Sequence, residues 1–191
     1  EHNFSGKAQF YNSRPTYPQE CIDYLVNKFG LSSNNVIADV GAGTGILTKP
    51  FLNMGCSAYA VEPNDDMFTE LSKNLSQYSN VILLKTSAEK TEIPENSCDA
   101  VVVGTAFHWF DKNKFCSECE RILKNKKHIA ILRISNNVMS YPASNPSRAT
   151  VAAEIGEAVI ACCDAITAIP KGLSGRIFVS VATSAITGNT E

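Results

Sequence analysis

The stretch that decides the fold is ADVGAGTGILT, residues 38–48. It follows a short apolar run that begins at Val36 and precedes residues of helical character, so it is the loop between a strand and a helix. Glycines at 41, 43 and 45 let the backbone bend sharply and approach a ligand, because no Cβ stands in the way. Such a loop also points free helical N–H groups at the ligand, and it therefore predicts a nucleotide-type binding site.

Short β-branched runs alternate with amphipathic segments from Val36 to Ser135. This alternation predicts an α/β, Rossmann-like fold with a mostly parallel central sheet and helices on both faces. Pro50 is expected to end or kink the first helix after the glycine loop. We expect strands at 36–40, 57–62, 81–86, 99–104 and 128–134, and helices at 45–55, at 64–78 from an Asn or Asp cap, and at 111–124 from Asp111.

The chain is expected to form one domain in three parts. Residues 1–35 would supply an N-terminal lid and a covering helix, whose apolar stripe contains Cys21, Ile22, Leu25, Val26 and Phe29. Residues 36–135 would form the Rossmann-like core. Residues 136–191 would be an atypical closing segment on the substrate side, with a helix at about 148–168 and strand-like stretches at 175–187. We expect closing strands that are antiparallel and incomplete.

Composition narrows the possible partners. The chain has 191 residues, 44% hydrophobic and 19% charged, and a formal charge of -2, so no clustered positive charge favours nucleic acid. The basic stretch at 124–127 is interpreted as a solvated turn. Cys116 and Cys119 have CxxC spacing, but they fall in a helical segment with no second pair and no histidine at ligand spacing, so the seven cysteines favour a reduced, cytoplasmic protein with no metal. No apolar run reaches membrane-spanning length. A monomer or a homodimer is expected.

The residues around the loop distinguish between nucleotide folds. Glu62 ends the second strand 23 residues after Asp39, where a carboxylate can accept both ribose hydroxyls of an adenosine. A dinucleotide fingerprint requires a glycine at the position of Ile46, and a P-loop requires a GKS or GKT that is absent. Asp39, two residues before the loop, suits a cationic ligand group better than a pyrophosphate.

Four ordered blocks carry a family resemblance over about residues 4–135. They are FSGKAQFYNSRPTYP at 4–18, DVGAGTG at 39–45, AVEPNDDM at 60–67 and TSAEKTEIPENSCDAVVVGTAFHWF at 86–110. Together they resemble class I S-adenosylmethionine-dependent methyltransferases of the ubiquinone-biosynthesis and trans-aconitate type, in the branch with an HW pair. The resemblance implies S-adenosylmethionine as cofactor, S-adenosylhomocysteine as product and a small-molecule methyl acceptor.

The resemblance also implies a role for each matching position. The methionine portion would face Asp39 and the loop backbone, Glu62 would hold the ribose, and backbone carbonyls after the fourth strand would receive the cofactor ammonium. Ser87 stands where the family often has Asp at the adenine edge. The implied cofactor-binding set is Asp39, Gly41, Ala42, Gly43, Glu62, Pro63, Met67, Ser87, Ala88, Gly104 and Thr105, with Arg14 as a candidate for the methionine carboxylate.

Catalysis has fewer candidates. A sulfonium donor is already activated, so a protein mainly positions the two reactants and excludes water. A nitrogen or oxygen nucleophile that must lose a proton could use His108 or Tyr11, whereas a carboxylate acceptor would need no base. Alternatively, His108 binds a carbonyl, while Tyr11 and Arg14 anchor the lid or Arg14 pairs with an acidic acceptor. Trp109 is interpreted as a packing residue.

Two further hypotheses stay open at this point. The stretch KGLSGRIFVSVATS at 171–184 resembles the family only weakly, and the chain continues for only 56 residues after Ser135. A methyltransferase-like protein that binds the cofactor with impaired catalysis is therefore one alternative. A nicotinamide-dependent oxidoreductase is the other, and Ile46 disfavours it.

Overall fold

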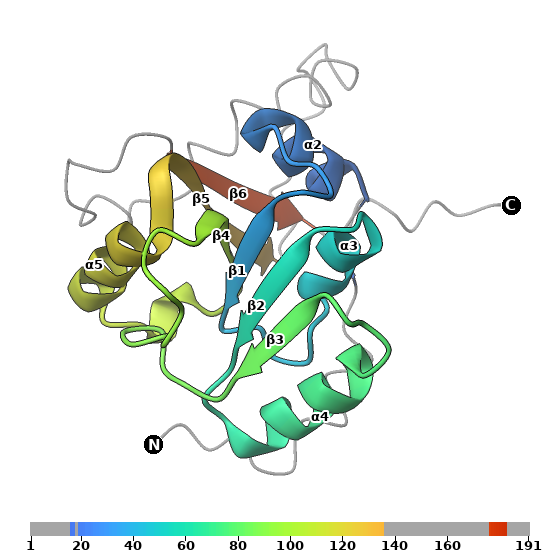
Figure 1. Ribbon diagram of the computed structural model, residues 1–191, viewed down its shortest axis with the longest axis vertical. Helices are drawn as coiled ribbons and strands as arrows, with labels where there is room; N and C mark the ends of the chain where they lie inside the picture. The colour runs from blue at the N-terminus through green and yellow to red at the C-terminus, as the bar shows by residue number, and fades with distance from the viewer. Residues whose placement is uncertain (1–15, 18, 136–175, 183–191) are drawn as a thin grey trace, which may run out of the picture.

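The computed structural model describes residues 16–17, 19–135 and 176–182 (Figure 1). Their secondary structure alternates between strands and helices, as the sequence predicts. The elements in chain order are α2 (Gln19–Phe29), β1 (Val36–Val40), α3 (Thr48–Asn53), β2 (Ser57–Val61), α4 (Asp65–Leu75), β3 (Val81–Leu84), β4 (Cys98–Gly104), the 3-10 turn η1 (Phe107–Trp109), α5 (Lys112–Ile122), β5 (Leu123–Ser135) and β6 (Arg176–Ala182).

The six strands form one sheet in the order β3-β2-β1-β4-β5-β6, and every neighbouring pair is parallel. The chain first builds outward from β1 to β3 and then returns to the other side of β1 with β4. Parallel sheets of this kind place ligand sites at the carboxyl edge, where the strand order reverses. In this sheet that point lies between β1 and β4.

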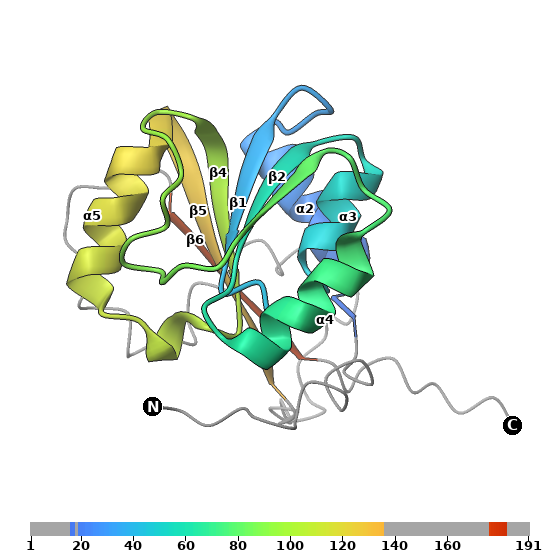
Figure 2. The ribbon, with the colours of Figure 1, turned by 60° about the horizontal axis from the view of Figure 1, so that its bottom comes forward.

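Helices cover both faces of the sheet, so the predicted Rossmann-like fold is confirmed (Figure 2). On one face, α2 and α3 bury Ile22, Leu25 and Phe51 against alternate side chains of β1, β4 and β5. Helix α4 packs on the same side, over β2 and α3. On the other face, α5 buries Phe115 and Ile122 against the opposite side chains of these strands. None of the described helices is long and apolar enough to span a bilayer.

Capping residues in the sequence determine where α4 and α5 begin. The side chain of Asn64 accepts a hydrogen bond from the N–H of Met67, and that of Asp111 accepts one from the N–H of Lys114. Both are N-caps, which satisfy a donor that has no partner inside the helix. These two predicted helix starts are therefore confirmed.

Helix α3 differs from its prediction at both ends. It covers Thr48–Asn53 rather than 45–55, and Pro50 is its third residue. Proline is tolerated there because the first N–H groups of a helix have no intrahelical acceptor. Pro50 therefore neither ends nor kinks this helix, contrary to the prediction.

The C-terminal side of the sheet also differs from its prediction. Strand β5 begins at Leu123, directly after α5, so the basic stretch at 124–127 is part of a strand rather than a turn. Strand β6 pairs with β5 in parallel, from Ile129 opposite Arg176 to Ser135 opposite Ala182, not antiparallel as expected. A parallel pair needs a crossover of about a dozen residues or more, and residues 136–175 exceed that length. The helix expected at 148–168 lies outside the described residues.

The described cysteines are interior residues. All five, Cys21, Cys56, Cys98, Cys116 and Cys119, are buried free thiols. Burial raises the pKa of Cys21 and of Cys98 to about 11, which makes both thiols poor nucleophiles. Among the residues that the structure describes, no group of three or more His, Cys, Asp or Glu side chains could hold a metal ion.

Candidate functional site

The carboxyl edge of the sheet collects most of the site residues predicted from the sequence. Strands β3, β2, β1 and β4 are adjacent and parallel, so the segments that follow them meet at the same edge. The predicted residues come directly after these strands: Gly41, Ala42 and Gly43 after β1, Glu62 and Pro63 after β2, Ser87 and Ala88 after β3, and Gly104 and Thr105 at the end of β4.

The glycine loop is bound tightly to the end of the neighbouring strand. The N–H groups of Gly41 and Ala42 both donate to the carbonyl oxygen of Val61 at 2.9 Å. Gly41 has a φ of +74°, and a Cβ there would lie 2.5 Å from the Cβ of Ala106. Gly43 has a φ of +57°, but nothing lies within 4 Å of the place where its Cβ would be. The predicted sharp bends are present, and Gly43 is the glycine that leaves open space for a ligand.

Glu62 connects the loop to the end of β2. Its Oε2 accepts from the N–H of Gly43 at 2.9 Å, and its Oε1 accepts from the N–H of Asn64 at 2.9 Å. The side chain is only 8% exposed, so it is not a solvated strand end. Burial raises the pKa of Glu62, while the two N–H groups act against this shift. Each carboxylate oxygen can accept a second hydrogen bond, so capacity remains for two ligand hydroxyls.

Asp39 lies beneath the loop, where only one of its two carboxylate oxygens has a hydrogen-bond partner among the described residues. Its Oδ2 accepts from the hydroxyl of Thr48 at 2.6 Å, and the residue is 1% exposed. Among the described residues, neither its Oδ1 nor the Oγ1 of Thr44 has a hydrogen-bond partner. Burial raises the pKa of Asp39 to about 7; the Thr48 bond lowers it and the charge of Glu62 raises it. A cationic group nearby would stabilise the ionised form.

The end of β4 is crowded by a residue that the sequence did not single out. Thr105 has a φ of +56°, and its N–H donates to the carbonyl of Leu132 at 2.7 Å. The hydroxyl of Tyr17 lies 3.5 Å from the Thr105 hydroxyl. A Cβ at Gly104 would come within 2.5 Å of the Tyr17 hydroxyl, so a larger residue there would displace the Tyr17 side chain. Tyr17 belongs to the N-terminal block that carries the family resemblance, which is the signal that could have identified it.

The residues proposed to border the adenine lie on two neighbouring segments. Pro63 is exposed, whereas Met67 in the first turn of α4 is 4% exposed. Ser87 is exposed and forms an antiparallel bridge with Lys90, while Ala88 is 5% exposed and packs in the core beneath α5. Because these residues follow the adjacent parallel strands β2 and β3, the residues predicted to border the adenine lie at the same edge of the sheet.

The HW pair lies on η1, directly after the end of β4. Both His108 and Trp109 are exposed, and their rings are 4.4 Å apart between centroids. Trp109 is 48% exposed, so the interpretation of this residue as a packing residue is wrong. Phe107 performs that role instead, because it is buried and its ring contacts Phe110 and Phe115 edge-on. Tyr11 and Arg14 lie outside the described residues.

Comparisons with known proteins agree with this arrangement. Residues 38–131 match the family described as a methyltransferase domain. An uncharacterized methyltransferase of Mycobacterium tuberculosis is 37% identical over 120 residues, which cover 63% of this chain and 46% of the relative. The chain therefore spans about half the length of these curated relatives.

Solved structures give the same fold. A SAM-dependent methyltransferase from Aquifex aeolicus superposes with a TM-score of 0.55 at 23% identity, over 63% of this chain and 67% of that one. A candidate methyltransferase from an antibiotic biosynthesis pathway of Anabaena variabilis gives a TM-score of 0.52 at 30% identity, over 58% and 43% of the two chains.

Proposed function

Because residues 38–131 belong to the class I S-adenosylmethionine-dependent methyltransferases, we propose that this chain binds that cofactor and methylates a small-molecule acceptor. The observation that supports this most directly is the contact of Glu62 with the glycine loop. The buried carboxylate accepts the N–H of Gly43 beside the open space at that glycine. A ribose there would meet both a carboxylate and a backbone without side chains.

The residues present fit the cofactor at three further positions. Asp39 offers a buried carboxylate oxygen with no partner among the described residues, which a cationic methionine group or its water would satisfy. Gly41 and Ala42 supply the loop backbone beside it. Carbonyls of Gly104 and Thr105 lie at the end of β4, where the family receives the ammonium.

The adenine would be bordered by two segments. Pro63 and Met67 follow β2, and Ser87 and Ala88 follow β3. The exposed Ser87 would present its side chain to the base, and the buried Ala88 would contribute its backbone. Arg14 stays a candidate for the methionine carboxylate.

The bound cofactor supplies an activated methyl group, so the protein's task is to position the acceptor and exclude water. His108 would accept the proton of a nitrogen or oxygen nucleophile, because it is exposed and lies three residues after Thr105. Tyr11 is the second candidate base. A carboxylic acid acceptor would need neither, and Trp109 would then serve as an exposed aromatic surface beside the site.

The proposal extends to the compartment and to the partners of the chain. The five described cysteines are free thiols, which supports a reducing, cytoplasmic setting. The net charge of -2 favours a small acceptor over nucleic acid.

The cofactor site is tested by Glu62→Ala, with Glu120→Ala as the matched control on the exposed side of α5. We expect Glu62→Ala to weaken S-adenosylhomocysteine binding at least tenfold in a calorimetric titration, because it removes a charged hydrogen-bond acceptor. Glu120→Ala should bind like the unmodified chain. Equal affinities of the two variants for S-adenosylhomocysteine would show that Glu62 does not contact this ligand.

Activity and acceptor class are tested by methyl transfer. The full chain with S-adenosylmethionine is incubated with panels of small carboxylic acids, phenols and amines, and formation of S-adenosylhomocysteine is measured. His108→Gln should reduce the rate with phenols and amines by roughly a hundredfold, while leaving the rate with carboxylic acids within a few fold. Equal loss in all three panels would contradict a role of His108 as a base.

A further inference from the structure

The loop between β3 and β4 contains a tight turn that carries two of the proposed adenine contacts. We call residues 87–90 the 87–90 turn. Its ends are bridged, because the N–H of Lys90 donates to the carbonyl of Ser87 at 3.2 Å. Just outside the turn, the hydroxyl of Thr86 donates to the carbonyl of Thr91 at 2.9 Å. The position of Thr91 therefore sets the position of the whole turn.

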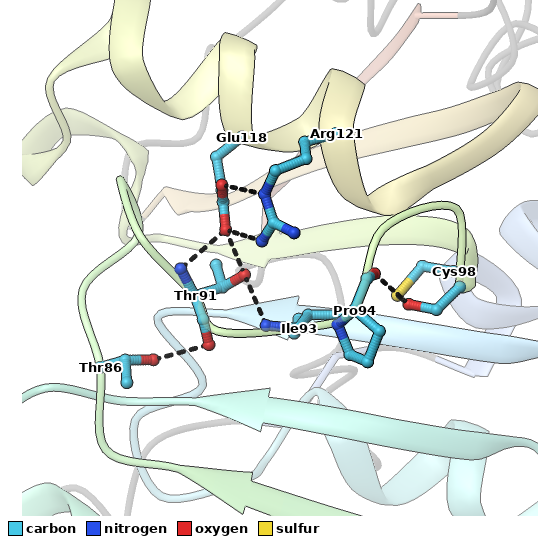
Figure 3. A network of polar contacts seen from close by, with 8 residues as sticks. Thr86, Thr91, Ile93, Pro94, Cys98, Glu118 and Arg121 are labelled. Atoms are coloured by element: carbon cyan, nitrogen blue, oxygen red, sulfur yellow. Dashed lines mark hydrogen bonds and ion pairs between the residues drawn. The ribbon is translucent and has the colours of Figure 1, made fainter.

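Thr91 is anchored to α5 by one carboxylate oxygen. Both its N–H and its hydroxyl donate to Oε1 of Glu118, at 2.8 and 2.6 Å (Figure 3). Thr91 has no exposed surface and Glu118 is 7% exposed, so water does not compete for these bonds. The hydroxyl of Thr91 also accepts from the N–H of Ile93 at 3.3 Å, which extends the network along the loop.

The side chain of Glu118 is itself held in place by Arg121. The guanidinium of Arg121 donates from Nε to Oε2 at 2.9 Å and from Nη2 to Oε1 at 2.7 Å. This bidentate pair fixes the plane of the carboxylate, and therefore the direction in which Oε1 faces Thr91. Burying a charge costs free energy unless the charge is fully paired. An apolar residue at this position would therefore be the less costly one for stability alone.

A second contact holds the other side of the turn. Oε1 of Glu89 accepts from the N–H of Asp111 at 2.9 Å, and Asp111 is the N-cap of α5. Helix α5 thus contacts the turn region through its N-cap, Asp111, and through its seventh residue, Glu118. Within the same turn, Ala88 is 5% exposed and packs among the core residues under α5.

We propose that Glu118 is a positioning residue for base recognition by the cofactor site. It fixes Thr91 and thereby sets where Ser87 and Ala88 meet the adenine edge. This inference rests on the proposed function, since it requires an adenine-containing ligand at the carboxyl edge of the sheet. A merely structural Glu118 would affect stability and would change the affinities for all cofactor analogues equally.

The test compares two ligands that differ only at the base. S-Inosylhomocysteine carries a carbonyl where S-adenosylhomocysteine carries the adenine amino group. We expect the unmodified full chain to prefer S-adenosylhomocysteine by roughly tenfold, about the value of one well-placed hydrogen bond. In Glu118→Gln the affinity for S-adenosylhomocysteine should fall roughly tenfold, and the preference should shrink to about threefold or less. The control Glu120→Gln makes the same chemical change on the exposed side of α5 and should keep the full preference.

A second pair of variants keeps the proposal testable if Glu118→Gln does not fold. Thr91→Val removes only the hydroxyl and should also reduce the preference, whereas Thr91→Ser retains the hydroxyl and should preserve it. An unmodified chain that binds neither ligand contradicts the proposed function itself. A chain that binds both ligands, with the same preference before and after the Glu118 and Thr91 changes, contradicts only the role of Glu118, as does an unmodified chain without preference.

Discussion

Asp39, a proposed cofactor-binding residue, lowers the stability of the ligand-free chain when its carboxyl is ionised. Its carboxyl is buried beneath the glycine loop, where Thr48 satisfies one oxygen and no described residue satisfies the other. Burial raises its pKa to about 7 from an ordinary value near 4, so the folded chain prefers the neutral carboxyl. Ionised Asp39 therefore opposes folding until a cationic group arrives.

We predict that Asp39→Asn stabilises the ligand-free chain at high pH. Between pH 4 and pH 7 the folded carboxyl stays protonated while the unfolded one ionises, so the free energy of unfolding of the unmodified chain falls across this window. Asparagine cannot ionise and can still accept from Thr48. Urea denaturation should show a gain on the order of 3 kcal/mol at pH 8 and little change at pH 4. A loss of stability at both values would contradict the burial argument.

Asp39 could be proposed as a site residue from its place before the glycine loop. Its burial could not be predicted from the sequence. Burial depends on α3, which brings Thr48 over the carboxylate. Similarly, the sequence does not distinguish the buried Phe107 from the exposed Trp109, because Phe107, Trp109 and Phe110 follow one another within residues 107–110. Which of them faces the core is decided by the geometry of η1.

At the scale of an element, the glycine loop combines two different requirements. Gly41 is needed for packing, because a Cβ there would lie 2.5 Å from Ala106. Gly43 has no such neighbour, and nothing lies within 4 Å of the place where its Cβ would be. Both have positive φ, which costs a residue with a Cβ about 1–2 kcal/mol.

We therefore predict that two alanine substitutions in this loop have separable effects. Gly41→Ala should lower the free energy of unfolding by more than about 3 kcal/mol, since the clash adds to the backbone cost. Gly43→Ala should lower it by about 1 kcal/mol, yet weaken S-adenosylhomocysteine binding at least tenfold. Chemical denaturation and calorimetric titration measure the two quantities. Undiminished binding by Gly43→Ala would place the ligand elsewhere.

Helix α5 contains a carboxylate, Glu118, whose pKa lies below its ordinary value. Burial alone would raise the pKa of Glu118, but the bonds from Arg121 and Thr91 outweigh it and lower the pKa to about 2. This lowered pKa stabilises the fold above pH 4.5, and the contribution is lost as the pH falls toward 2. Glu118→Gln should therefore be less stable than the unmodified chain by about 2 kcal/mol at pH 7, discounting for the part-exposed Arg121. The stability difference should shrink steadily in denaturation curves taken between pH 4.5 and pH 2, and a constant difference would contradict it.

Most element positions could be predicted because local signals determine them. The β-branched runs give β1 to β4 within two residues at each end, and Asn64 and Asp111 mark two helix starts by capping. The start of α3 could not be predicted, since the glycine loop has helical turns before Thr48. The role of Glu118 could not be predicted either, because it depends on Thr91, which is 27 residues away in the chain.

At the scale of the whole molecule, the sheet order explains why these parts meet. Strand β1 lies between β2 and β4, so the glycine loop has Glu62 on one side and Thr105 on the other. Alternation of strands and helices predicts such a sheet, but pairing direction at its far edge is not a local property. Strand β6 pairs with β5 in parallel, and the sequence of 176–182 contains no sign of that direction.

We propose that this carboxyl edge binds an adenosyl sulfonium cofactor rather than a dinucleotide. Calorimetric titration of the full chain with S-adenosylhomocysteine and, separately, with NADH tests it most directly. We predict saturable binding of S-adenosylhomocysteine at one site per chain and no heat with NADH. Clear binding of NADH together with no heat from S-adenosylhomocysteine would contradict the account.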